Sequence, residues 1–80
     1  MTSLTVEYFA QLREQAGQGQ QAVDSDAESL ASLYAQLKQQ HGFRLGTTQL
    51  RVAVNAEFAD WQQPLTEGSL VVFIPPVAGG

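Results

Sequence analysis

The chain has 80 residues, of which 44% are hydrophobic and 15% charged, which is enough for one small globular domain and too apolar for a disordered segment. Eight acidic and four basic residues give a formal net charge of −4, which argues against nucleic acid or an anionic membrane as the main partner and favours a basic protein. The absence of cysteine excludes disulfides, thiolate metal sites and a cysteine nucleophile, and we expect neither a metal site nor a bound cofactor. Residues 1–7 lack the basic and apolar regions of a signal peptide, and no run reaches transmembrane length, so we expect a cytoplasmic protein.

The first elements are short. Residues 4–8 alternate between apolar and polar, which predicts a strand with one buried face. Phe9 breaks the alternation on the polar side, so it is either covered by the next segment or exposed for a partner. Residues 10–16 favour one or two helical turns that end at Gly17, and residues 20–23 favour a second strand.

The main helix carries the most distinct signals. Ser25 and Glu28 match a capping box, in which the serine oxygen accepts from the N3 amide and the glutamate reaches back to the cap N–H, so we expect the helix to begin there. His41 in the last turn and Gly42 at a left-handed position predict its end. The helix dipole accounts for His41, and we expect no catalytic role for it. The apolar stripe of this helix consists of Ala27, Leu30, Leu33, Tyr34 and Leu37.

Three more strands are predicted in the second half of the chain. They cover residues 50–54, 57–59 and 69–74, which gives the order β-β-α-β-β-β. One main helix can cover only one face of a sheet. Residues 70–74 are nevertheless apolar on both faces, the pattern of a strand buried on both sides. We therefore expect another protein to cover the second face.

Three side chains are candidates for that docking face, namely Phe9, Phe58 and Ile74. For Phe9 and Phe58, ordinary core packing is the alternative. Arg13 could contact the partner, steady the end of the chain, or be a plain surface arginine. The side that faces the helix should carry Leu4, Val6, Tyr8, Val71 and Phe73.

The last six residues form a distinct tail. Pro75 and Pro76 fix φ and offer no N–H, so the sheet should end at about Ile74. Gly79 and Gly80 have no Cβ, so their backbone is thin enough to carry a carboxylate into the active site of another protein. A frayed terminus is the alternative. Because the chain has no cysteine, any sulfur chemistry must use the C-terminal carboxyl.

Several segments together resemble one known family. They are Tyr8-Phe9-Ala10-Gln11-Leu12-Arg13-Glu14, Val54-Asn55, Pro64-Leu65-Thr66-Glu67-Gly68 and Pro75-Pro76-Val77-Ala78-Gly79-Gly80. The element order resembles the ubiquitin-like β-grasp fold, and the segments are similar to the small, sulfur-carrier subunit of molybdopterin synthase. Ile74 departs from that family, which often has phenylalanine there. The resemblance implies an α+β chain in which residues 1–80 are one domain with a mixed four- to five-stranded sheet, one main helix on one face, and residues 75–80 as an extended tail.

The resemblance also implies a mechanism. An activating enzyme would use ATP to adenylate the Gly80 carboxyl at the end of the Gly79-Gly80 tail, and sulfur from a donor system would then replace AMP. The thiocarboxylate would attack a cyclic pterin precursor inside the large subunit, which would supply the catalytic groups within a heterotetramer. The implied partner contacts are Phe9, Arg13, Phe58, Ile74, Pro75, Pro76 and Val77.

Two other functions remain open from the sequence. One is a sulfur carrier for another pathway, such as thiazole synthesis or tRNA thiolation, with the same activation and a different acceptor. The other is a β-grasp interaction module or protein modifier, whose Gly79-Gly80 end is conjugated to lysines or left inert.

Overall fold

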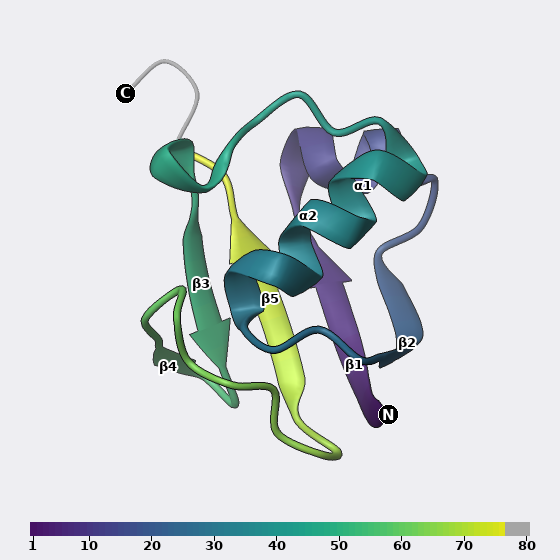
Figure 1. Ribbon diagram of the computed structural model, residues 1–80. Helices are drawn as coiled ribbons and strands as arrows, with labels where there is room; N and C mark the ends of the chain where they lie inside the picture. Colours follow the sequence, from purple (N-terminus) through teal and green to yellow (C-terminus); the bar gives the residue numbers. More distant parts are fainter. Residues whose placement is uncertain (77–80) are drawn as a thin grey trace.

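The computed structural model describes residues 1–76, which form a five-stranded mixed sheet in the order β2-β1-β5-β3-β4 (Figure 1). Strands β1 and β5 run parallel to each other, and the other three neighbouring pairs, β2–β1, β5–β3 and β3–β4, are antiparallel. The predicted β-grasp arrangement is therefore confirmed. The strands are β1 (Thr2–Tyr8), β2 (Gln20–Ser25), β3 (Arg51–Val54), β4 (Glu57–Phe58) and β5 (Leu70–Ile74).

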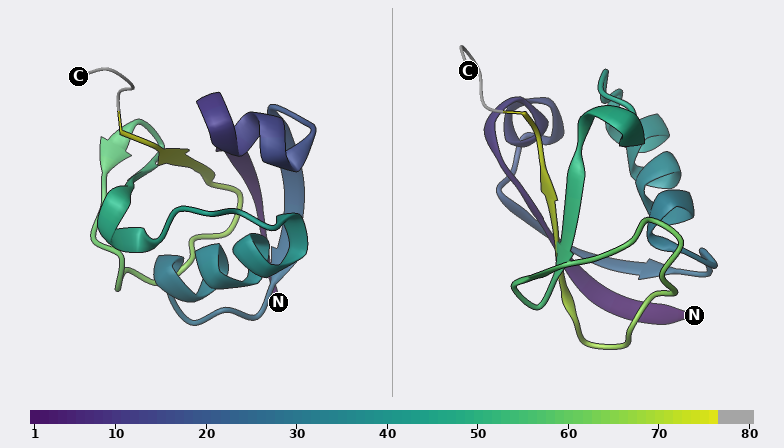
Figure 2. Two further views of the ribbon diagram at one scale, coloured as in Figure 1. Left: turned by 90° about the horizontal axis from the view of Figure 1, so that it is seen from above. Right: turned by 90° about the vertical axis from the view of Figure 1, so that its left-hand side faces the viewer.

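Two α-helices and one short 3-10 helix complete the fold: α1 (Ala10–Ala16), α2 (Leu30–His41) and η1 (Thr47–Gln49). The helix α2 lies on one side of the sheet, as the right-hand view of Figure 2 shows. Both predicted helix ends are confirmed, because Gly17 and Gly42 have φ values of 75° and 73° and close the helices in the left-handed conformation. No helix among residues 1–76 is long and apolar enough to cross a membrane.

The predicted start of α2 at Ser25 is wrong. Ser25 is the last residue of β2, and its hydroxyl accepts a hydrogen bond from the amide of Ala27 at 3.0 Å within a local turn. The N-cap is Ser29, whose hydroxyl accepts from the amide of Ser32 at 3.2 Å. Both serines favour a local side-chain bond to the backbone, so the sequence motif alone selected the wrong one.

Hydrogen bonds to a distant loop determine that the helix begins after Ser29 and not at Ser25. The amides of Leu30 and Ala31 would have no partner in the first turn of α2. They donate to the carbonyls of Gln63 and Trp61 respectively, each at 2.9 Å. Because this loop satisfies the donors of a helix that begins at Leu30, the tertiary contact fixes the helix start.

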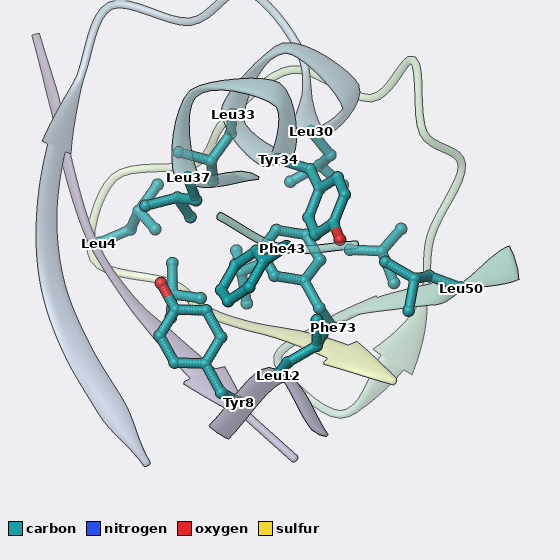
Figure 3. Packing of buried hydrophobic residues seen from close by; sticks show 13 residues of the cluster. Leu4, Tyr8, Leu12, Leu30, Leu33, Tyr34, Leu37, Phe43, Leu50 and Phe73 are labelled. Carbon is teal, nitrogen blue, oxygen red and sulfur yellow. The ribbon is translucent and has the colours of Figure 1, made fainter. Parts of the chain in front are cut away.

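The core lies between α2 and the sheet, and Figure 3 shows its side chains. The side chains predicted to face the helix are confirmed there, since each is at most 5% exposed: Leu4, Val6, Tyr8, Val71 and Phe73. Tyr34 meets Phe73 edge-on with ring centroids 5.0 Å apart, and Trp61 stacks on Phe73 at 5.9 Å. Trp61, which the sequence left without a role, therefore packs against the core.

Both tyrosine hydroxyls of the core have hydrogen-bond partners. Tyr34 donates to the carbonyl of Leu45 at 2.7 Å, and Tyr8 donates to Oε1 of Gln21 at 2.7 Å. Burial raises the pKa of Tyr34 to about 12. Burial, with a smaller contribution from the charge of Tyr34, raises the pKa of Tyr8 to about 12 as well. Burial disfavours the charged phenolate, so both rings are neutral in the folded protein.

Candidate functional site: the open face of the sheet and the base of the tail

The second face of the sheet is open, as predicted from the last strand. Along β5, Val71 and Phe73 point to α2 and are fully buried, whereas Leu70, Val72 and Ile74 point the other way and are half-buried. The alternation follows from the period of two in a strand. No helix among residues 1–76 therefore covers the apolar side chains of the second set.

The strand register builds one row of side chains across this open face. Glu7 pairs with Val72, Val72 with Ala53, and Ala53 with Phe58, so the row crosses β1, β5, β3 and β4. Directly paired residues lie on the same face of a sheet. The row brings together residues that are up to 65 positions apart in sequence.

A shallow hollow of about 340 Å³ lies over this row. Phe9 and Phe58 border it with side chains that are 45% and 69% exposed, and Ile74 borders it at the end of β5. The structure thus brings all three predicted docking residues to one surface, and their exposure rules out core packing for the two phenylalanines. We call this surface the open face, lined by Glu7, Phe9, Ala53, Ala56, Phe58, Leu70, Val72 and Ile74.

Local backbone structure holds Phe9 at this surface. Phe9 is extended, with φ −125° and ψ 156°, so it continues the alternation of β1. Its carbonyl accepts from the amide of Leu12 at 3.1 Å, and Leu12 is fully buried. The first turn of α1 therefore packs inward through Leu12 and leaves the Phe9 ring on the opposite side.

The β3–β4 hairpin holds Phe58. The guanidinium carbon of Arg51 lies 5.3 Å from the centroid of the Phe58 ring, which is cation–π geometry. The turn of the hairpin is Asn55-Ala56. Asn55 exchanges two hydrogen bonds of 2.9 Å with Leu70, through its own amide and its Oδ1, and so ties the hairpin to the start of β5.

The base of the tail adjoins the open face at Ile74. Pro75 is buried and Pro76 is exposed. A second hollow of about 350 Å³ lies where they leave the sheet, and Arg51 and Ile74 line it together with both prolines. Ile74 thus borders both hollows. Val77, Gly79 and Gly80 lie outside the described residues.

Arg13 lies apart from the open face. It is exposed on α1 and borders another hollow of about 540 Å³ with Ala10, Glu14 and Gly19. Its guanidinium packs over Gly19, where an added Cβ would lie 3.4 Å from Nε. The hollow beside Arg13 and the hollow on the open face share no lining residue.

The contacts that His41 makes are structural. Its Nε2 lies 2.8 Å from Oε1 of Gln21, the same oxygen that accepts from Tyr8. Since an amide oxygen only accepts, Nε2 carries the proton in this arrangement. The His41 ring also contacts Phe43, with centroids 5.2 Å apart. These contacts join the end of α2 to β1 and β2.

Sequence reasoning missed six residues of the site, namely Glu7, Arg51, Ala53, Ala56, Leu70 and Val72. The alternation of β3 places Arg51 and Ala53 on one face, so the cation beside the docking face could have been found from that pattern. Leu70 and Val72 follow from the doubly apolar strand itself. Only Ala56 depends on the turn, and no apolar pattern indicates it.

Comparisons with known proteins agree with this arrangement. The chain is 35% identical to the molybdopterin synthase sulfur carrier subunit of Escherichia coli (strain K12), across 96% of this chain and 99% of that protein. The crystal structure of SAMP1 from Haloferax volcanii is 26% identical, with a TM-score of 0.80, covering 98% of this chain and 99% of that one.

The fold also matches a chain in the complex of subunits 1 and 2 of molybdopterin-converting factor from Helicobacter pylori 26695. The TM-score is 0.69 at 24% identity, covering 99% of this chain and 100% of that one, and at this identity the likeness concerns the fold. The model of the ThiS family matches residues 6–80. The chain therefore belongs to the ThiS family.

Proposed function

We propose that this chain is the sulfur-carrier subunit of a molybdopterin synthase. One geometric observation supports the proposal most: Ile74 borders both the open face and the hollow at the base of the tail. A large subunit that covers the open face would therefore lie beside Pro75 and Pro76, where the chain leaves the sheet. The 35% identity to the Escherichia coli sulfur carrier subunit supports the same function.

In this proposal the carboxyl group of Gly80 is the chemical centre. An activating enzyme transfers AMP from ATP to the carboxylate and releases pyrophosphate, because a free carboxylate is a poor electrophile. A sulfur donor system then supplies sulfide, which displaces AMP and leaves a thiocarboxylate. Residues 1–80 act as one domain, with 75–80 as the tail that presents this group.

In the large subunit the thiocarboxylate sulfur attacks a carbon centre of a cyclic pterin phosphate precursor, and a C–O bond of the precursor breaks as the C–S bond forms, the oxygen leaving as phosphate oxygen or water. Two such transfers build the dithiolene. Hydrolysis of each acyl–sulfur bond regenerates the Gly80 carboxylate. This chain contributes the sulfur and its placement, and the large subunit contributes the acid, base and phosphate-binding groups. Phe9, Phe58, Ile74 and Pro76 contact that subunit, and Pro75, which is buried, holds the base of the tail beside it.

Val77 also contacts the large subunit, and Arg13 contacts it at the edge of the interface. The working assembly is a heterotetramer of two carrier chains and two large subunits in the cytoplasm. The complex of subunits 1 and 2 from Helicobacter pylori shows that a chain of this fold can pair with a second subunit.

Replacing Gly80 tests the role of the tail. Gly80→Val carrying a chemically prepared thiocarboxylate should bind the large subunit as tightly as the original chain and transfer sulfur at least about a hundredfold more slowly, because a small displacement of the reacting atom costs that much. Titration measures binding, and single-turnover mixing measures transfer. Gln39→Ala, at an exposed position of α2, is the matched control and should change neither.

Two results would contradict the proposal. Transfer at the original rate by Gly80→Val would exclude delivery through a narrow channel. An intact mass of the protein purified with its activating enzyme that shows no exchange of oxygen for sulfur would exclude the thiocarboxylate.

A protein modifier is the second candidate, because SAMP1, a small archaeal modifier protein, shares the fold over almost the whole chain. Conjugation to lysines predicts a ladder of adducts in cell extracts, whereas a carrier predicts free protein with one discrete change of mass. A carrier for thiazole synthesis or tRNA thiolation would give the same change of mass. Recovery of a thiazole synthase in place of a molybdopterin synthase large subunit would identify that pathway.

A further inference from the structure

The turn between β3 and β4 contains a strained residue. Asn55 and Ala56 are the two residues between the strands, and both have positive φ values, 50° and 72°. A two-residue hairpin turn with two positive φ values is of type I′, which prefers asparagine followed by glycine. Asn55 fits the first position. Ala56 occupies the second, where its Cβ crowds the backbone and glycine would be free of strain.

The fold itself gives no reason for the Ala56 methyl group. Ala56 is exposed, so its side chain fills no space in the core. It does line the open face, together with Phe58, Ala53 and Val72. A residue that keeps a strained backbone without a packing gain is often part of a functional surface.

We infer that the methyl group of Ala56 is a recognition contact for the large subunit, which makes Ala56 a specificity-determining residue of the open face. This inference rests on the proposed function. The hollow beside Ala56 is lined by apolar side chains and by Glu7 as its single charged residue. The matching element of the large subunit is therefore an apolar side chain that enters the hollow, with a basic residue beside it to meet Glu7.

Two substitutions in opposite directions test the inference. Ala56→Gly relieves the strain and removes the methyl group, so its melting temperature should rise by about 2 to 5 °C while its Kd for the large subunit rises about fourfold, as for one buried methyl-sized group. Gly42 has a φ of 73°, almost the value at Ala56, and an added Cβ there would meet no atom within 4 Å. Gly42→Ala, at the end of α2, should therefore lower the melting temperature and leave the Kd unchanged.

A third variant separates the methyl contact from stiffness of the turn. Asparagine tolerates the left-handed conformation, so Ala56→Asn keeps a restricted turn while it places an amide group on the open face. We expect its Kd to rise at least as much as that of Ala56→Gly. The measurements are calorimetric titration with the large subunit and thermal melts of the free carrier.

The outcomes distinguish this inference from the proposed function. If Phe58→Ala weakens binding and both Ala56 variants bind like the original chain, Ala56 is not a recognition residue and the docking face stands. If Phe58→Ala also binds normally, the docking face itself is wrong. If the Ala56 variants alter sedimentation of the carrier alone and leave the titration unchanged, the open face pairs two copies of this chain, which would also overturn the inference.

Discussion

The two faces of the sheet have similar chemistry and opposite environments. On β5, Val71 is 0% exposed beneath α2, while its neighbour Val72 is half-buried on the open face. Phe73 is buried among aromatic rings, whereas Phe58 remains 69% exposed. Residue type therefore does not decide which face of the sheet is covered and which face remains open. The side on which α2 packs decides which face is covered. We therefore expect mutations on the covered face to lower stability and mutations on the open face to weaken binding.

The largest expected effect is on the covered face. Phe73→Ala should lower the free energy of unfolding by about 3 to 5 kcal/mol, because it removes a fully buried ring that contacts Tyr34 and Trp61. Denaturant unfolding measures this change. Phe58→Ala is the matched control and should change stability by less than about 1 kcal/mol. Equal losses in the two variants would remove the distinction between the faces.

On the open face the effect should appear in binding. Phe58→Ala should weaken association with the large subunit by about 1 to 3 kcal/mol, because an exposed aromatic ring is a typical interface hot spot. Phe9→Ala and Ile74→Ala should weaken it in the same direction. Titration against the large subunit provides the values, and thermal melts should show only small changes. Unaltered affinity in all three variants would mean that no partner uses this face.

A smaller effect is expected at the start of α2, the element that defines the covered face. Ser29→Ala should cost about 1 kcal/mol of stability, since the hydroxyl caps the amide of Ser32. Chemical denaturation is the readout, and Gln39→Ala should be neutral. If Ser29→Ala were neutral and Glu28→Ala destabilising, the helix would start at the capping box predicted from the sequence.

The smallest effect concerns alkaline pH. The pKa values of Tyr8 and Tyr34 are raised from 10.0 to about 12 in the folded protein, so their contribution is complete below pH 10 and is lost as the pH rises toward 12. At about pH 10.5 the loss should be below about 1 kcal/mol for each tyrosine. Unfolding midpoints at pH 8 and pH 10.5 measure it. Tyr34→Phe should reduce the slope; an unchanged slope would place the titration elsewhere.

Much of the fold could be predicted because local signals and tertiary structure agree. The alternation in β1 and β5 and the glycines after α1 and α2 depend on near neighbours, and they predicted these elements to within about two residues. The start of α2 failed because the carbonyls of Trp61 and Gln63 decide it from a distant loop. No local pattern contains that information.

The residues of the candidate site also fall into those that a local pattern predicts and those that depend on tertiary structure. Phe9, Phe58 and Ile74 could be proposed because each breaks or ends an apolar pattern in the sequence. Their meeting on one surface depends on the register of four strands. Ala56 could not be found, because its significance depends on a φ value and not on hydrophobicity.

The place of β5 in the sheet has a consequence for synthesis. This strand is the last of the five along the sequence, yet it lies between β1 and β3 and pairs with both. A ribosome makes β1 first, and β1 must wait for almost the whole chain before its parallel neighbour emerges. Loop closure of this length slows folding. The complete sheet can therefore form only after the ribosome has made every residue through Ile74, because β5 supplies the pairing partner of both β1 and β3.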